Sequence, residues 1–398
     1  MSMSIQPTIY SADHHLIDPT AIDADALYVI QRLTEAGFVA YLVGGGVRDL
    51  LFHRRPKDFD ISTSARPEEI RRLFRNCLLI GRRFRLAHVR FGRKVIEVST
   101  FRAGDPETDA LITHDNEWGT PEQDVLRRDF TINGLYYDPR DHAVIDYVGG
   151  FADIERRRLM TIGVPEVRFR QDPVRMIRLL KFRARFDLEI EPATERALWQ
   201  CSPEIRKSSP ARVLEELLRM LESGAAAPFF QLMVDTNLLQ QLLPGLSRAL
   251  CAEYEGHEMM LILQAVDLLQ QGSRTPLPRA ALVAALFWPL MRGLVEAHWK
   301  ADGAVPHLGE LLSLANHLVS EMLESFTHFP KRLRWLVTQT LLHQFRFTPL
   351  EPGRIPRLRM PSEEKMLALE VLRIRSVLDP TLLPIYEQLR GERRGHAR

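Results

Sequence analysis

Two short stretches set the fold of this chain, Gly44-Gly45-Gly46-Val47-Arg48-Asp49 and, nine residues later, Asp58-Phe59-Asp60. An apolar run, residues 39–43, precedes the first stretch, and residues 47–52 have the composition of a helix start. The expected order is therefore strand, glycine turn and helix. Glycine lets backbone N–H groups approach phosphate oxygens closely, and a helix N-terminus adds a favourable field for an anion. We expect this turn to bind a polyphosphate.

The second stretch carries a pair of acids. Asp58 and Asp60 stand two apart on an expected strand, so both carboxylates point to one face while Phe59 and Ile61 point to the other. Mg²⁺ prefers oxygen ligands and keeps part of its coordination shell for substrate phosphates. The pair therefore predicts a divalent-metal site beside the glycine turn.

A third acid lies on another expected strand, residues 94–100. Its alternation puts Glu97 on the face opposite Ile96 and Val98. Three acids can share two metal ions in nucleotidyl transfer, and on that ground we expect Glu97 to complete the site. The alternative is that Glu97 lies on a solvated strand face.

A second cluster reads Arg127-Arg128-Asp129-Phe130-Thr131-Ile132-Asn133-Gly134-Leu135 and follows a polar segment, residues 104–123, of turn and loop composition. Fork-shaped guanidinium groups suit triphosphate oxygens, and Asp129 and Asn133 are able to fix an arginine or a ribose hydroxyl. The alternative for this cluster is a capped surface helix.

A third cluster is an expected helix with Asp172 as its N-cap and Pro173 at its first position. Arg175, Arg178 and Lys181 recur along it every three residues and drift slowly around one face. A solvated basic face is the usual explanation of such a stripe. Since no acid is interleaved to relieve the repulsion, we expect a polyanion as the counter-charge.

These motifs resemble those of the class II nucleotidyltransferases, which comprise bacterial CCA-adding enzymes and poly(A) polymerases. The match consists of Gly-Gly-x-Val-Arg-Asp, Asp-x-Asp, Arg-Arg-Asp-Phe-Thr-x-Asn and Asp-Pro-x-Arg-x-x-Arg, in this order within about 140 residues. The resemblance implies an α+β chain, with a nucleotidyltransferase head in which helices flank a small mixed β-sheet, followed by an all-α neck, body and tail. It also implies ATP as a substrate and two Mg²⁺ ions, with Mn²⁺ as an alternative ion.

The resemblance also implies residue roles. The catalytic acids and metal ligands would be Asp58, Asp60 and Glu97. The nucleotide-binding residues would be Gly44, Gly45 and Arg48 at the triphosphate, Arg128, Asp129 and Asn133 at the nucleotide and ribose, and Asp172, Arg175, Arg178 and Lys181, which close the pocket from the neck. Two positions depart from the usual pattern, Gly134 in place of Ala or Ser and Lys181 in place of Arg. The first keeps a small residue and the second keeps the charge.

Three segments favour a poly(A) polymerase over a CCA-adding enzyme. Residues 79–89, Leu-Ile-Gly-Arg-Arg-Phe-Arg-Leu-Ala-His-Val, resemble the stretch typical of bacterial poly(A) polymerases, as does the region after residue 329. The Glu-Asp-x-x-Arg motif with which CCA-adding enzymes read CTP and ATP is not found. A helix opening with Ser209-Pro210 stands in its place, and its apolar stripe makes it mainly structural, although Arg212 is placed to face a base.

We therefore expect transfer of AMP from ATP to the 3′-hydroxyl of RNA, a template-independent tailing reaction that serves mRNA processing and decay. The runner-up is CCA addition to tRNA. A different class, a non-catalytic RNA-binding protein on the same scaffold, is disfavoured because a decayed site would have lost Asp58 or Asp60, and both are present.

Composition agrees with a phosphate-rich ligand. The 398 residues carry a formal net charge of only +2, but residues 48–102 hold 15 Lys and Arg against 6 Asp and Glu, about +9. The basic end, residues 390–398, is expected to touch RNA phosphates, although solvated charged tails are common. Three isolated cysteines indicate neither a disulfide framework nor a zinc cluster. We expect a cytoplasmic monomer that does not enter membranes.

The expected partners are RNA 3′ ends and ATP, together with RNA-decay or RNA-chaperone proteins. The expected domains are a catalytic head (1–150), a neck with nucleotide-pocket helices (151–203), an RNA-binding helical body (204–345) and a tail with a basic end (346–398). Residues 21–38 are predicted as a helix with Leu27, Ile30 and Leu33 inward, and residues 362–377 as a tail helix.

Overall fold

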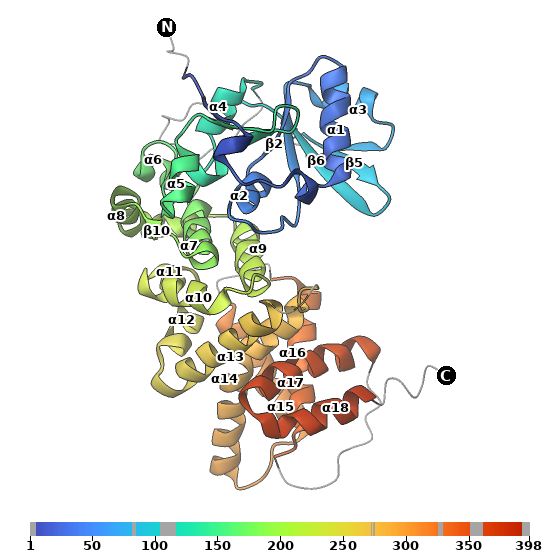
Figure 1. The fold of residues 1–398 in the computed structure, drawn as a ribbon. Coiled ribbons are helices and arrows are strands. Elements are labelled where there is room, and N and C mark those ends of the chain that lie inside the picture. The colour runs from blue at the N-terminus through green and yellow to red at the C-terminus, as the bar shows by residue number, and fades with distance from the viewer. Residues whose placement is uncertain are drawn as a thin grey trace. The chain divides into compact units, whose positions relative to one another are not determined.

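The computed structural model describes residues 5–81, 85–103, 117–271, 273, 275–324, 329–350 and 361–391. The chain forms two compact units (Figure 1). The first is Met1–Arg175 with Asp187–Cys201, and the second is Met176–Phe186 with Ser202–Arg398. A mixed sheet and its helices make up the first unit, whereas every named element of the second is helical. The predicted α+β class is confirmed.

The first unit is built on an eight-stranded sheet of order β1-β8-β7-β2-β3-β6-β5-β4. Strands β3 and β6 are parallel and every other neighbouring pair is antiparallel, so the sheet is mixed, as predicted. The strands are β1 (Thr8–Tyr10), β2 (Ala40–Val43), β3 (Asp60–Thr63), β4 (Cys77–Ile80), β5 (Leu86–Phe91), β6 (Lys94–Thr100), β7 (Leu135–Asp138) and β8 (Ala143–Asp146).

Helices α1 (Ala24–Glu35) and α3 (Pro67–Leu73) cover one face of this sheet (Figure 1). The side chain of Asp23 accepts the N–H of Asp25 and so caps α1, which is shorter at both ends than the predicted helix. Ile30 and Leu33 are buried as predicted, whereas Leu27 is only half-buried.

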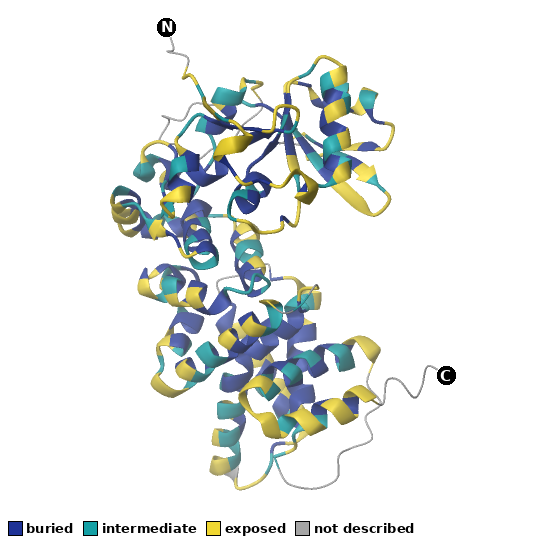
Figure 2. Ribbon diagram, in the orientation of Figure 1, coloured by how far each residue is buried: buried dark blue, intermediate teal, exposed yellow. Residues whose placement is uncertain are grey.

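Among the described residues, the opposite face of the sheet is covered over one half only. Over β2, β7 and β8, an apolar core joins Val43, Tyr136 and Ile145 to Val125 of α4 (Pro121–Leu126) and to Ile162. Over β6, β5 and β4, alternate residues of the same face are half-buried or exposed, and Figure 2 colours stretches of these strands yellow. The sheet therefore presents an open surface beside a closed one.

Short elements complete the first unit, and α7 (Val174–Phe186) begins in it and continues into the second. This helix starts one residue later than predicted, because Pro173 is its flanking residue and Asp172 ends the preceding helix. The short elements are η1 (Ala12–His14), η2 (Pro19–Ala21), α2 (Gly45–Leu51), η3 (Thr131–Asn133), α5 (Gly150–Glu155), β9 (Arg158–Leu159), α6 (Pro165–Gln171), β10 (Glu189–Ile190) and α8 (Pro192–Cys201).

The second unit packs its helices around α14 (Arg279–Asp302), which lies against α13 (Glu253–Gln271), α16 (Lys331–Phe347) and α17 (Ser362–Leu378). Arg279–Ala301 is the one described helix long and apolar enough to cross a membrane, but 67% of its most apolar stretch is buried, as expected for a core helix. The other helices are η4 (Ser202–Lys207), α9 (Pro210–Leu221), α10 (Ala226–Asp235), α11 (Leu238–Leu242), α12 (Pro244–Cys251), α13 (Glu253–Gln271), α15 (Leu308–Met322), α16 (Lys331–Phe347), α17 (Ser362–Leu378), η5 (Pro380–Leu382) and α18 (Leu383–Gly391).

Two predictions hold in the part of the chain that the structure describes. A tail helix begins at Ser362 as expected, and the three cysteines of the chain are free. Most of the predicted basic end lies outside the described residues, as do residues 82–84, 104–116 and 351–360. The finer division into neck, body and tail stays a prediction.

Candidate active site

The glycine turn forms where the sequence predicted it, between β2 and α2. Gly44 has a φ of 67°, in the left-handed region that favours glycine, and its N–H donates to the carbonyl oxygen of Leu135 at 3.3 Å. A Cβ at this position would lie 3.2 Å from Nη1 of Arg128. Glycine is therefore required both by the backbone conformation and by the close approach of Arg128.

A buried network joins this turn to the second motif. Arg48 of α2 donates through Nη1 to Oδ1 of Asn133 at 2.6 Å, and Asn133 donates through Nδ2 to Oδ1 of Asp129 at 2.9 Å. Nε and Nη2 of Arg48 also donate to Oδ1 of Asp49, at 2.9 and 2.6 Å. The structure thus brings together three predicted site residues that are up to 85 positions apart. Their contact with a nucleotide stays a prediction.

Arg128 lies between the sheet and α4. Its Nη2 donates to Oδ2 of Asp124 at 2.8 Å and to Oγ of Ser62 at 3.3 Å, and its guanidinium stands 5.6 Å from the ring centroid of Tyr136. Desolvation disfavours the charge, but Asp124 and Tyr136 together more than offset it and raise the pKa of Arg128 above its ordinary value. Sequence reasoning missed Asp124, whose spacing four residues before Arg128 on a helix was the available signal.

Arginine side chains crowd around this motif. Desolvation, together with repulsion from Arg102, Arg128 and Arg175, lowers the pKa of Arg127 to about 10. The same two causes, with Arg175 as the main repelling neighbour, lower the pKa of Arg168 to about 9. A polyanion would relieve this repulsion, so the cluster has the electrostatics of a polyphosphate site.

Two buried arginines hold the backbone of the motif. Arg168 of α6 donates through Nη2 to the carbonyl oxygen of Arg128 at 2.6 Å and through Nη1 to Oε1 of Gln171 at 2.8 Å. Arg175 of α7 donates to the carbonyl oxygens of Arg127 at 3.0 Å and Arg168 at 3.3 Å. Arg175 was predicted to bind nucleotide, which stays a prediction, whereas Arg168 was missed because no charge pattern distinguishes it from its exposed neighbours.

The acids gather at one end of β3. Asp60 is the first residue of this strand and lies opposite Glu97 of β6 in the parallel register. Asp58 precedes the strand, so the prediction that both acids of the pair lie within it was wrong by two residues. Desolvation and the carboxylates of Glu97 and Asp58 raise the pKa of Asp60 to about 6. Oε2 of Glu97 also lies 3.3 Å from Nε2 of His88 on β5.

These acids have the donor chemistry that a divalent cation requires. Within the described residues, no three His, Cys, Asp or Glu side chains gather closely enough to form a ready-made metal site. Oxygen ligands suit Mg²⁺ and Mn²⁺. The assignment of ions to Asp58, Asp60 and Glu97 stays a prediction.

The basic stripe on α7 meets an acid from its own chain. Nζ of Lys181 donates to Oε2 of Glu216 at 2.5 Å, and Nε of Arg178 lies 3.9 Å from Oε1 of the same carboxylate. Glu216 belongs to α9, which begins at Pro210 as predicted. The expectation that only a polyanion would supply the counter-charge was therefore incomplete. The nucleotide roles of Arg178, Lys181 and Asp172 stay predictions.

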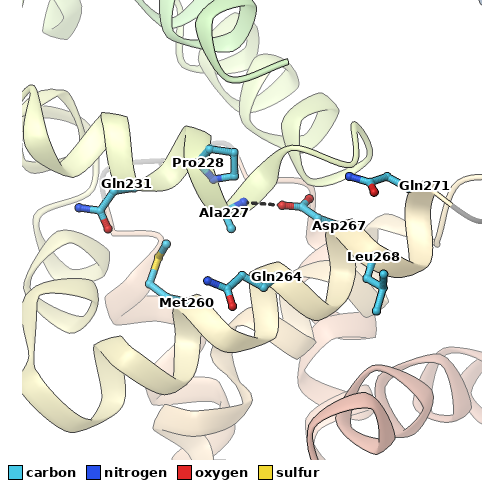
Figure 3. Close-up of a pocket in the computed structure, with 8 residues that line it drawn as sticks. All are labelled: Ala227, Pro228, Gln231, Met260, Gln264, Asp267, Leu268 and Gln271. Carbon is cyan, nitrogen blue, oxygen red and sulfur yellow. Dashed lines mark hydrogen bonds between the residues drawn. The ribbon is translucent and has the colours of Figure 1, made fainter. Parts of the chain in front are cut away.

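A separate open pocket of about 560 Å³ lies between α10 and α13 (Figure 3). Its one acid, Asp267, accepts the N–H groups of Ala226 and Ala227 at 2.6 and 2.8 Å, so this carboxylate caps α10. The pocket therefore offers no acid for catalysis. Its lining consists of Ala227, Pro228, Gln231, Met260, Gln264, Asp267, Leu268 and Gln271.

Proteins of known family resemble this chain in sequence. The family model for the "Poly A polymerase head domain" matches residues 40–160, and that for the "Probable RNA and SrmB- binding site of polymerase A" matches residues 187–250. Poly(A) polymerase I of Salmonella typhi is 36% identical over 385 residues, which is 94% of this chain and 82% of that protein. The chain belongs to the poly(A) polymerase family. It is a nucleotidyltransferase, and members of the family use divalent metals.

Other relatives belong to the CCA-adding branch. The CCA-adding enzyme of Lactobacillus helveticus is 35% identical over 218 residues, 54% of each protein. Among solved structures, the Bacillus stearothermophilus CCA-adding enzyme in complex with CTP is 27% identical with a TM-score of 0.67, and the match covers 92% of this chain and 80% of that one. This chain and the CCA-adding enzymes therefore share the fold and part of the sequence.

Proposed function

We propose that this chain is a polynucleotide adenylyltransferase, which adds AMP from ATP to the 3′-hydroxyl of RNA and releases pyrophosphate. One observation carries the proposal: the poly(A) polymerase I of Salmonella typhi matches 94% of the chain, whereas the CCA-adding enzyme of Lactobacillus helveticus, of comparable identity, matches 54%. CCA addition to tRNA is the second candidate. It is favoured by the likeness to the CCA-adding enzyme solved with CTP.

The proposed mechanism divides the work between the two halves of the site. The Gly44 turn and the guanidinium groups around Arg128 bind and neutralise the triphosphate, which pre-orients the α-phosphate for attack. Asp58, Asp60 and Glu97 would hold two Mg²⁺ ions, or Mn²⁺ in their place. When bound, such ions would supply activation of the attacking hydroxyl and charge neutralisation for the leaving pyrophosphate.

The proposal extends to partners and location. We propose that the protein acts as a monomer in the cytoplasm, where its substrates ATP and RNA 3′ ends are found. The match of residues 187–250 to a probable RNA and SrmB-binding segment supports RNA binding by α8 to α12 and a partner from the RNA-decay or RNA-chaperone machinery.

A nucleotide-dependent extension assay tests the proposal. The protein is incubated with oligo(A) or with tRNA that lacks its 3′ end, and with ATP or CTP separately. We expect long extension of oligo(A) with ATP and no incorporation of CTP. Incorporation of CTP on the truncated tRNA would replace the proposal with CCA addition, and no incorporation of either nucleotide on either RNA would reject both.

The metal role of the acids has its own test. Asp60→Ala removes the carboxylate opposite Glu97, so we expect it to abolish AMP transfer while the melting temperature and RNA retention stay near those of the parent. Appreciable residual polymerisation by this variant would refute the metal role of Asp60.

A further inference from the structure

The sheet face that carries the acids continues to the edge of the sheet, and none of the helices that the structure describes covers it there. Partner residues in a sheet point to the same side, and the register aligns Asp60, Glu97, His88 and Leu78 in one row across β3, β6, β5 and β4. This row starts at the proposed metal site and ends on an edge strand. Anything that lies along β5 and β4 therefore lies beside the reacting groups.

Three apolar side chains are gathered on this open half. Leu78 and Ile80 of β4 are 45% and 42% exposed, and Val95 of β6 is 42% exposed. His88 and Arg90 of β5 point to the same side between them. Single exposed apolar residues are ordinary, but a group of them on one face beside a reactive row indicates a binding surface. We name these five residues the β4–β6 face.

The phosphate-binding groups lie on the other side of Asp60. Gly44 follows β2, and Arg128 contacts Ser62 of β3 and stands over Tyr136 of β7. Phosphoryl transfer places the attacking and leaving oxygens roughly in line. With the triphosphate over β2 and β7, the attacking hydroxyl approaches from the side of β6 and β5.

We propose that the β4–β6 face binds the last nucleotides of the RNA, with bases against Leu78 and Ile80 and a backbone phosphate at Arg90. This inference rests on the proposed function. Neighbouring strands are about 4.8 Å apart, so β4 lies about 10 Å from Glu97 on β6, within reach of the terminal nucleotides. Apolar side chains bind the faces of all bases, which suits a product that grows without a template.

A pair of matched variants tests the face. Leu78→Ser with Ile80→Ser removes its apolar contacts, and Ile9→Ser removes an apolar side chain that is 64% exposed on β1, the opposite edge of the same sheet. We expect the KM for oligo(A) to rise about tenfold in the double variant while the KM for ATP changes less than about twofold. Ile9→Ser should leave both constants unchanged. An unchanged KM for oligo(A), or an equal rise in the control, overturns the proposal.

Photo-crosslinking gives a second readout that needs no catalysis. An oligo(A) ending in a photoreactive base is bound with an unreactive ATP analogue, irradiated and mapped. We expect the crosslink on β4, β5 or β6, and crosslinks confined to other elements would overturn the proposal. Arg90→Gln, which keeps the apolar residues, should also weaken oligo(A) binding measured by anisotropy.

These experiments distinguish a failure of the β4–β6 face from a failure of the proposed function. Normal tailing with an unchanged KM for oligo(A) in the variants rejects the β4–β6 face and leaves the proposed function intact. Conversely, a protein that transfers no AMP, yet crosslinks RNA on β4, β5 or β6 and loses RNA affinity in the variants, rejects the proposed function and retains the face.

Discussion

At the scale of single residues, the most informative side chain is Asp60. It stands at the start of β3 in line with Glu97, and the two neighbouring carboxylates, added to desolvation, raise its pKa to about 6. A group in this state holds a proton at mildly acid pH and gives it up when a cation binds. The perturbed pKa is thus the electrostatic counterpart of the proposed metal role.

This state predicts a pH-dependent metal affinity. Below pH 6 a metal ion has to displace the proton of Asp60, so we expect the metal concentration for half-maximal activity to rise up to about tenfold per pH unit as the pH falls from 6 to 5. Between pH 7 and 8 the metal concentration for half-maximal activity should be nearly constant. Titrations with Mg²⁺ and Mn²⁺ at each pH measure this concentration, and activity at saturating metal is the control. A metal affinity that is constant from pH 5 to 7 contradicts the assignment.

Arg168 is the second residue whose role follows from its contacts. It is almost fully buried, and it holds the carbonyl oxygen of Arg128 while its own carbonyl oxygen accepts from Arg175. It does not belong to the motifs from which the site was predicted. Its role is to position the guanidinium cluster rather than to touch substrate.

A substitution series tests that role. Arg168→Met leaves the carbonyl of Arg128 without this donor, so we expect the KM for ATP to rise about tenfold and the free energy of unfolding to fall by about 1–3 kcal/mol. Arg168→Lys should be intermediate, since an ammonium keeps the charge but not the fork geometry. Arg170→Met on the exposed side of α6 is the control. A loss of stability with an unchanged KM for ATP would indicate a structural role alone.

At the scale of elements, helices of the second unit are fixed by side chains from their neighbours. α10 begins without a capping side chain of its own, and Asp267 of α13 accepts its first N–H groups instead. Glu216 of α9 in the same way receives Lys181 and approaches Arg178 of α7. Long-range acids therefore replace the local signals from which element ends are usually predicted.

The cap on α10 has a measurable contribution. Asp267→Ala leaves the N–H groups of Ala226 and Ala227 without their acceptor, and we expect the free energy of unfolding to fall by about 1–3 kcal/mol in urea titrations. Asp267→Asn keeps one acceptor oxygen and should lower the free energy of unfolding by less than Asp267→Ala does. The specific activity of the folded variants should match that of the parent. Equal losses for Ala and Asn would show that the acceptor is not the stabilising feature.

At the scale of the whole molecule, charge is unevenly distributed. The net charge is +2, yet residues 48–102 carry about +9. Contacts between cationic side chains and RNA phosphates release counterions, so their strength falls as salt rises. A whole-chain net charge near zero therefore does not imply weak dependence on salt.

We accordingly expect oligo(A) binding to weaken about 20-fold between 50 and 200 mM monovalent salt, as for about three phosphate contacts on a single strand. Fluorescence anisotropy across this range gives the slope of log affinity against log salt. Arg90→Gln should reduce that slope by about 0.7. A flat response in the parent would exclude phosphate contacts as a main source of affinity.

The sequence by itself determined the strand, glycine turn and helix, the alternation that places Glu97 on the face opposite Ile96 and Val98, and the class of chemistry. These features are local, because a phosphate turn and a strand's two faces are fixed by residues a few positions apart. Only the tertiary structure joined Arg48 to Asn133, put Arg168 behind Arg128 and gave Lys181 its partner Glu216.

The open half of the sheet was likewise decided by tertiary structure. Whether Leu78 or Ile80 is covered depends on which helices pack on each face, and α1 and α3 cover the opposite one. The register that aligns Asp60, Glu97 and His88 is set by long-range strand pairing, which local periodicity does not encode. Sequence thus specified the reacting groups, and the packing of distant elements decided which surfaces around them were left for a substrate.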